Sequence, residues 1–158
     1  ATVAPMASSH FRAGVVIVVM HPDSLRVMAF ERADSPEHWQ LPQGGLRAGE
    51  TPLDGAWREL GEETGLGPEE VEIHREFPDW LTYEWPDDVR ADKGGPCNRI
   101  GQVQKWFIGE ARSGDVEPEP DGNEFLAWRW VEPAWLVEHV PPWRRGPYER
   151  VLGGLRRG

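Results

Sequence analysis

Apolar residues along the chain gather in short runs that have the length of β-strands. The longest run covers residues 15–20, and five of its six residues are β-branched, which is typical of a buried strand. A second run at residues 25–30 follows the sequence His21-Pro22-Asp23-Ser24, whose residue types favour a turn. We therefore predict a β-hairpin over residues 14–30. Further strands are predicted at residues 71–76, 79–83, 102–110 and 126–131.

Three segments have the pattern of helices, at residues 52–64, 133–139 and 147–155. The first follows Thr51, a good N-cap, and stops at Gly65, a residue that favours the left-handed conformation of a C-cap. Residues 86–99 and 112–123 are rich in Pro, Gly and acidic residues, so we predict loops there. Strands and helices do not alternate regularly. An α/β protein with a mixed sheet flanked by helices therefore fits better than a doubly wound parallel sheet.

The length of 158 residues suits one domain with its own core. We expect a single domain at residues 10–158, preceded by a disordered tail at residues 1–9. No apolar run approaches the ~20 residues that cross a membrane, so we expect no membrane partner. Cys97 has no second cysteine with which to form an internal disulfide, which is compatible with the reducing cytoplasm.

The predicted helix at residues 52–64 carries a group of carboxylates on one face. Glu59, Glu62 and Glu63 are three and four positions apart, so their side chains project together. Each like-charge pair costs a few tenths of a kcal/mol, roughly, and a hard cation such as Mg²⁺ or Mn²⁺ would offset this repulsion. Arg58 is placed to pair with Glu62 at i,i+4. The alternative interpretation is an acidic helix face exposed to solvent.

Residues 44–66 resemble the signature of the Nudix hydrolase family. That signature is Gly, five residues, Glu, seven residues, Arg-Glu, an aliphatic, one residue, Glu-Glu, one residue, Gly and an aliphatic. Every position is filled, by Gly44, Glu50, Arg58, Glu59, Leu60, Glu62, Glu63, Gly65 and Leu66. The stretches WQLPQGGL, GQVQKWFIGE and EFLAWRWV are similar to one branch, which contains bacterial RNA 5′-pyrophosphohydrolases and asymmetrical diadenosine tetraphosphate hydrolases. The resemblance implies the Nudix fold, a mixed sheet sandwiched between helices (α/β/α).

The resemblance also implies roles for the residues of the signature. The metal ligands would be the side chains of Glu59, Glu62 and Glu63 together with the carbonyl oxygen of Gly44. Glu50 would brace the signature loop, and Gly65 would have a structural role at the helix end.

Outside the signature, the branch has an acid just before its Phe-x-x-Trp-x-Trp-Val motif that reaches the metals. Glu124 holds this position and is our candidate for the general base, grouped with Glu59 and Arg58 as catalytic. The alternative for Glu124 is a surface glutamate that closes a loop.

Candidate substrate contacts are Arg12, Arg32 and Lys105 for the phosphates and Tyr83 for stacking on a base. A simple exposed lysine fits Lys105 equally well. Arg12 departs from the branch, because the RNA-processing members usually carry the corresponding arginine further upstream of Gly14.

The formal net charge of −10 argues against broad nucleic-acid binding. We therefore expect a metal-dependent pyrophosphohydrolase that cleaves a phosphoanhydride in nucleoside polyphosphates. Dinucleoside tetraphosphates are slightly preferred as substrates over the 5′ end of triphosphorylated RNA. A Nudix domain that binds nucleotide without turnover is a further alternative, against which the intact acids of the signature argue.

Overall fold

The computed structural model describes residues 10–93 and 99–157. The tail predicted at residues 1–9 and Cys97 lie outside the described residues. In chain order the elements are β1 (His10–Met20), β2 (Val27–Arg32), β3 (Ser35–Gln40), β4 (Gln43–Gly45), α1 (Pro52–Thr64), β5 (Val71–Glu76), β6 (Leu81–Glu84), α2 (Asp87–Lys93), β7 (Arg99–Ala111), β8 (Phe125–Val131), α3 (Pro133–His139), the 3₁₀ helix η2 (Pro142–Arg144) and α4 (Arg145–Leu152). Among the described residues, no helix is long and apolar enough to cross a membrane.

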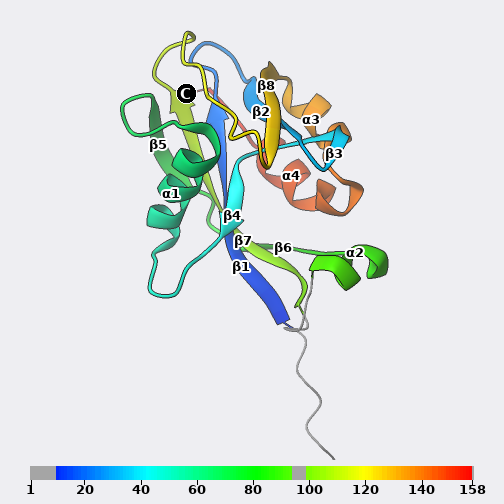
Figure 1. Cartoon of the computed structure of the whole chain (residues 1–158). Coiled ribbons are helices and arrows are strands. Elements are labelled where there is room, and N and C mark those ends of the chain that lie inside the picture. The colour runs from blue at the N-terminus through cyan, green and yellow to red at the C-terminus, as the bar shows by residue number, and fades with distance from the viewer. Residues whose placement is uncertain (1–9, 94–98, 158) are drawn as a thin grey trace, which may run out of the picture.

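The strands form one mixed sheet that splits along β1. The main path is β3-β2-β1-β7-β5, and β4, β6 and β8 pair with β1, β7 and β2 in turn. Among the strand pairs of residues 10–93 and 99–157, only β1–β7 is parallel. β7 occupies one edge of β1, while β4 pairs with its start at Gly14 and β2 pairs with its end at Met20. Strands β2 and β4 thus leave β1 in different directions (Figure 1).

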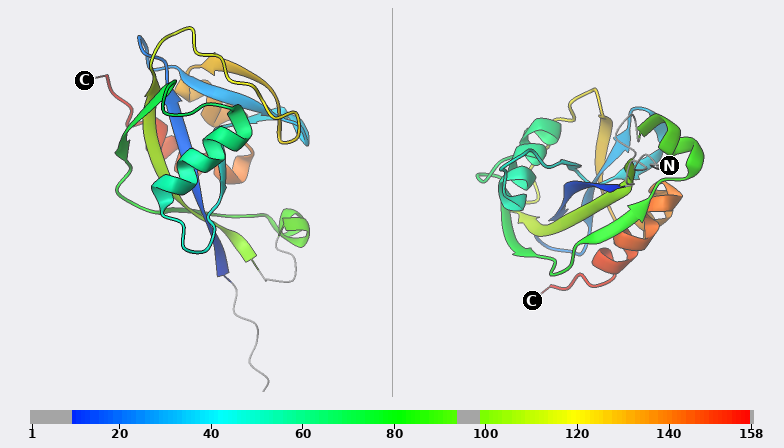
Figure 2. Two further views of the ribbon diagram at one scale, coloured as in Figure 1. Left: turned by 60° about the vertical axis from the view of Figure 1, so that its left-hand side comes forward. Right: turned by 90° about the horizontal axis from the view of Figure 1, so that it is seen from below.

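Helices cover both faces of the sheet, with α1 on one face and α3 and α4 on the other (Figure 2). The run at residues 15–20 is apolar throughout because β1 is buried on both faces. Val15, Ile17 and Val19 pack in the core under α1, whereas Val16 and Val18 pack in the core under α3 and α4. These two apolar layers hold the helices in place on the sheet.

Most predicted elements are confirmed, including the α/β class, the mixed sheet and the helices at residues 52–64 and 133–139. The turn at residues 21–24 does join β1 to β2, but Met20↔Val27 is their only registered pair, and β2 pairs mainly with β8 and β3. One prediction was wrong, and two strands were missed. Helix α2 lies in a segment predicted as a loop, and β3 and β4 were missed because they are polar, short and contain Pro36 or paired glycines.

Candidate active site

Helix α1 holds the predicted acids in a defined orientation. It starts after Thr51, whose Oγ1 accepts a hydrogen bond from the Asp54 N–H at 3.1 Å, and it ends at Gly65, which has a left-handed φ of 73°. Both predicted caps are confirmed. Ala56 and Leu60 are fully buried against the sheet, so the helix cannot rotate about its own axis without exposing them.

Arg58 is the hub of an ion-pair network on this helix. Its Nε and Nη2 donate to the two carboxylate oxygens of Glu50 at 2.6 and 2.8 Å. Its Nη1 donates to Glu59 at 2.7 Å and to Glu62 at 3.2 Å, which confirms the predicted i,i+4 pair. Nη2 also donates to the Gly45 carbonyl at 2.9 Å. The hydrogen bonds from Arg58 chiefly lower the pKa of Glu50 to about 2, and they tie the loop to the helix.

Two further acids near this network resist ionisation. Glu63 is buried and accepts a 3.3 Å hydrogen bond from the Gln43 N–H. Burial, and after it the charges of Glu124 and Glu59, raise the pKa of Glu63 to about 10. Glu124 is exposed as a residue, yet partial burial of its carboxyl group, followed by the charges of Asp121 and Glu59, raises its pKa too. Such shifts show that nearby positive charge does not offset the burial and the mutual repulsion of these acids.

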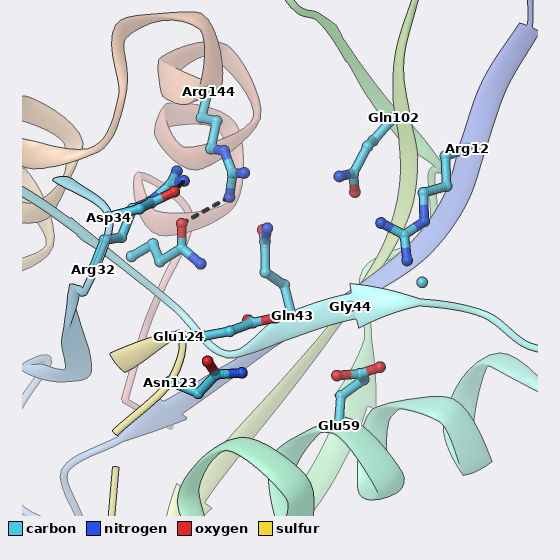
Figure 3. Close-up of a pocket in the computed structure, with 12 residues that line it drawn as sticks. Arg12, Arg32, Asp34, Gln43, Gly44, Glu59, Gln102, Asn123, Glu124 and Arg144 are labelled. Carbon is cyan, nitrogen blue, oxygen red and sulfur yellow. Dashed lines mark hydrogen bonds and ion pairs between the residues drawn. The ribbon is translucent and has the colours of Figure 1, made fainter. Parts of the chain in front are cut away.

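The paired glycines of β4 allow two charged side chains to approach the strand closely. A Cβ on Gly44 would lie 2.0 Å from the carboxyl carbon of Glu59, and a Cβ on Gly45 would lie 2.3 Å from Nη2 of Arg12. Any larger residue would therefore push Glu59 or Arg12 away. Glu59 reaches β4 from α1 on one side, and Arg12 reaches it from β1 on the other (Figure 3).

A cavity of about 280 Å³ opens where β2 and β4 diverge. Its lining combines arginines, acids, amides and glycines, namely Arg12, Arg32, Asp34, Gln40, Gln43, Gly44, Gly45, Glu59, Gln102, Asn123, Glu124 and Arg144. Figure 3 shows Arg12 and Arg144 pointing into the cavity from the side opposite Glu59. Cations thus face carboxylates across one cavity.

Two of the lining arginines are nine-tenths buried and have spare donors. Arg32 forms a bidentate pair with Asp34 at 2.9 and 2.8 Å, and Arg144 donates through Nη1 to Oε1 of Gln40 at 2.9 Å. Within the described part of the chain, Nη1 of Arg32 and Nε of Arg144 are buried without a hydrogen-bond partner. A buried, unpaired guanidinium N–H is costly, and an anionic ligand in the cavity would satisfy it.

Glutamines from β4 and β7 add neutral donors. Nε2 of Gln104, which is fully buried, donates to Oε1 of Gln43 at 3.3 Å and to Oε1 of Gln102 at 2.9 Å. Each of these oxygens therefore accepts one hydrogen bond, and the amide N–H groups of Gln43 and Gln102, for which the described residues show no acceptor, can donate into the cavity that these residues line. The site therefore favours a ligand rich in acceptor oxygens.

A comparison with known protein families identifies the family that has this site. The NUDIX domain family matches residues 10–151. The chain belongs to the Nudix family. The resemblance seen in the signature is confirmed, and the matched range covers both arms of the split sheet and all residues that line the cavity.

Curated Nudix relatives are similar over nearly the whole chain. An RNA pyrophosphohydrolase of Zymomonas mobilis is 40% identical over 149 residues, which are 93% of this chain and 96% of the relative. An RNA pyrophosphohydrolase of Cereibacter sphaeroides is also 40% identical, over 92% of this chain and 91% of the relative. One from Francisella tularensis is 39% identical over 147 residues, 91% of this chain and 92% of the relative.

Solved structures share the Nudix fold at lower identity. The E. coli dihydroneopterin triphosphate pyrophosphohydrolase superposes with a TM-score of 0.75 at 20% identity, over 92% of this chain and 99% of that one. A C. elegans Ap4A hydrolase superposes with a TM-score of 0.65 at 22% identity, over 92% of this chain and 99% of that one. These likenesses confirm the fold. The protein is a Nudix hydrolase that cleaves a phosphoanhydride bond in nucleoside polyphosphates, and Nudix enzymes generally use divalent metal ions such as Mg²⁺ or Mn²⁺.

The predicted metal ligands are only partly gathered. Gly44, Glu59 and Glu124 line the cavity, and Glu63 lies behind it against β4. The Glu62 side chain is 49% exposed and pairs with Arg47 and Arg58. Across residues 10–93 and 99–157, no three His, Cys, Asp or Glu side chains stand in an arrangement that could hold a metal ion. The carboxylates of Glu59 and Glu62 are instead paired with Arg58.

Two predicted substrate contacts lie outside the cavity lining. Tyr83 is buried. The guanidinium carbon of Arg144, which lines the cavity, lies over the Tyr83 ring at 5.4 Å from its centroid. Lys105 projects from the face of β7 opposite Gln104, where its Nζ donates to the Pro78 carbonyl at 3.0 Å and pairs with Glu76 at 3.3 Å. In this arrangement neither residue is free to reach a ligand there. Arg12 and Arg32, by contrast, are both brought into the cavity.

Sequence reasoning missed several lining residues, including Gln40, Gln43, Gln102, Asn123 and Arg144. Gln43 and Gln102 lie in the quoted stretches WQLPQGGL and GQVQKWFIGE, so the signal for them was present in the sequence. Arg144 stood among the C-terminal arginines, and nothing in its local pattern distinguishes it from exposed Arg145.

Proposed function

We propose that this Nudix hydrolase acts on the 5′ end of triphosphorylated RNA and releases pyrophosphate. The observation that carries the proposal is the cavity itself, where buried arginines with spare donors face the acids of α1 across a space of about 280 Å³. This arrangement suits a chain of phosphates with the arginines at one end and the hydrolytic groups at the other. Curated relatives that match over more than 90% of both chains are named RNA pyrophosphohydrolases, which supports RNA as the substrate.

We infer that Glu59, Glu63, Glu124 and the Gly44 carbonyl would hold Mg²⁺ or Mn²⁺ after their side chains draw together from the present arrangement, joined by Glu62 once Arg58 releases it. Their all-oxygen donor set suits a hard cation. Gly44 lets the Glu59 carboxylate approach β4 closely, and this placement of an acid beside a backbone carbonyl, with the raised pKa of Glu63, supports a cation at this position. When bound, the metal supplies charge neutralisation for the phosphates and polarises water.

The residues of the chain itself then have distinct tasks. Arg32, Arg144 and Arg12 bind phosphate oxygens, and the amide donors of Gln43 and Gln102 bind others. A water molecule attacks phosphorus, its proton passes to the carboxylate of Glu124, and the P–O bond to the departing pyrophosphate breaks. The products are RNA with a 5′-monophosphate and inorganic pyrophosphate. Arg58 acts as a positioning residue, because it holds Glu59 at 2.7 Å.

Dinucleoside tetraphosphates, which the sequence favoured, become the second candidate. The formal net charge of −10 supports this smaller substrate, because acidic proteins repel long nucleic acids. The distribution of charge in the cavity weakens that argument, since its three arginines can bind phosphates although three acids line it as well. We place the protein in the cytoplasm, where either substrate would be found.

A product assay tests the proposal. The protein is incubated with Mg²⁺ and, separately, with 5′-triphosphate RNA, a dinucleoside tetraphosphate and single nucleoside triphosphates, and the products are identified by mass. We expect the highest kcat/KM for the RNA, with pyrophosphate released. A higher kcat/KM for the dinucleotide would move the function to the second candidate. Binding without turnover of any substrate would contradict both.

A further inference from the structure

Arg129, on β8, lies in a corner between two tryptophans on the face covered by α3. Its guanidinium carbon is 4.5 Å from the ring centroid of Trp39 and 4.4 Å from that of Trp135. The centroids of the two indole rings are 5.8 Å apart and the ring planes are inclined by 72°, so the guanidinium contacts two rings that are nearly perpendicular to each other. The rings hold the cation in one orientation, which a free surface arginine does not have.

Arg129 is exposed, and its N–H groups have no hydrogen-bond acceptor or ion-pair partner within the described part of the chain. It differs in this from neighbouring Arg26, whose Nε donates to Glu132 at 2.9 Å. Both arginines line a hollow of about 260 Å³ together with Trp130, Trp135, Val131 and Glu132. Since Glu132 is neutralised by Arg26, Arg129 is the uncompensated charge of this hollow.

Strands β8 and β3 each run between the catalytic cavity and the hollow. Glu124 lines the cavity immediately before β8 begins, and Arg129 is five residues further along, about 16 Å at ~3.3 Å per residue. Trp39 directly precedes Gln40, another residue of the cavity lining. A ligand that starts in the cavity must therefore extend well beyond its first nucleotide to reach Arg129.

We propose that the surface around Arg129, at this hollow, binds a backbone phosphate of the single-stranded RNA downstream of the 5′ nucleotide. The inference rests on the proposed function. Trp39 and Trp135 hold the guanidinium in place, and its N–H groups, which have no partner within the described residues, can donate to a backbone phosphate, a contact that carries no sequence information. On a chain with a formal net charge of −10, an unpaired arginine beside the cavity supplies the local attraction that the whole protein lacks.

The test compares substrates of different length in Mg²⁺. With a 5′-triphosphate RNA of about ten nucleotides, Arg129→Gln should raise KM about fivefold and leave kcat unchanged, the scale for one exposed charge contact. The slope of log affinity against log salt should fall in magnitude by about one, since one phosphate contact is lost. With a single nucleoside triphosphate, which is too short to reach the surface, KM should not change.

Two variants serve as controls. Arg112→Gln removes the same charge from an exposed arginine that pairs with Glu72, and it should leave both substrates unaffected. Arg129→Lys keeps the charge and should restore the salt slope. The inference is overturned if KM for the RNA is unchanged in Arg129→Gln, or if KM for the RNA and for the mononucleotide rise by the same factor.

A binding measurement separates this inference from the proposed function. The affinity of wild-type protein and of Arg129→Gln for a fluorescent RNA with a 5′-monophosphate is measured by anisotropy, which needs no turnover. Weaker binding by Arg129→Gln supports the surface even if triphosphate RNA is not hydrolysed, a result that would overturn the proposed function alone. Equal binding by the two proteins would overturn the surface.

Discussion

The two sides of the cavity differ in how their charges are satisfied. On the acid side, Arg58 has bonds to Glu50, Glu59 and Glu62, so the side chains of the Nudix signature hold one another. On the arginine side, Arg32 and Arg144 are buried, and each has a donor with no partner among the residues that the structure describes. The acid side is thus internally paired and ready to orient a reaction, whereas the arginine side is completed only by an anionic ligand. We therefore expect substitutions on the acid side to lower the catalytic rate and substitutions on the arginine side to weaken substrate binding.

Glu59→Gln should have the largest effect, because it removes a charge from the acid side without changing shape. We expect turnover to fall about 10³-fold or more, the upper range for loss of a group that acts on the reacting atoms. Activity in Mg²⁺ and the melting temperature are measured together. A folded variant that keeps more than a few per cent of wild-type activity would contradict the assignment of Glu59 to the metal.

Glu124→Gln tests the acid side at its second position. Loss of a general base should lower kcat about 10²-fold with a smaller change in KM. The matched control is Glu117→Gln, which removes the same charge from an exposed position away from the cavity. If kcat of Glu124→Gln equals that of the control, Glu124 returns to the role of a surface glutamate.

Arg144→Gln addresses the arginine side and should affect binding rather than rate. A lost charged hydrogen bond costs roughly 1.5 kcal/mol, so we expect KM to rise about tenfold with kcat nearly constant. The adjacent Arg145→Gln is the control, because Arg145 is exposed and donates only to the Glu138 carbonyl. A drop in kcat with KM unchanged would contradict the assignment of the arginine side to binding.

Asp34→Asn should have a smaller effect on the same side. Asp34 holds Arg32 by a bidentate pair, but the Asp34 side chain is 63% exposed, and such pairs are weak. We expect KM to rise about threefold, and Asp23→Asn in the exposed turn after β1 to change nothing. Steady-state kinetics on both variants decide whether Asp34 positions Arg32.

Glu50 gives a prediction for stability against pH. Its pKa is lowered to about 2 in the folded protein, so its pair with Arg58 stabilises the fold above the ordinary pKa of about 4.5. This contribution should be lost as the pH falls from about 4.5 to about 2. The difference in melting temperature between wild type and Glu50→Gln should therefore shrink over this range. A constant difference would mean that the pair does not stabilise the fold.

The same contrast explains what the sequence could predict. Apart from Glu124, the acid side comes from residues 44–66, so spacing along one loop and helix was enough to place Glu50, Arg58 and the caps of α1. The arginine side comes from β1, β2 and η2, which only the split of the sheet brings together. Arg12 and Arg32 were found by charge, but no local pattern separates Arg144 from its neighbours.

Lys105 shows the limit of reasoning from charge alone. Alternation along β7 places Lys105 and Gln104 on opposite faces, and the cavity lies on the side of Gln102 and Gln104. The face that a strand turns to the site depends on its pairing with β1, which is parallel and joins segments far apart in the chain. The sequence predicts the strand but not the face.

The most direct measurement is the equilibrium affinity of Glu59→Gln for RNA, since this variant binds without consuming the ligand. Labelled RNA with a 5′-triphosphate and with a 5′-monophosphate is titrated in Mg²⁺ with Glu59→Gln and with the double variant Glu59→Gln/Arg144→Gln. We predict that Glu59→Gln binds the triphosphate about tenfold more tightly than the monophosphate, and that the second substitution removes most of this preference. Equal affinity of Glu59→Gln for the two RNAs would contradict the account.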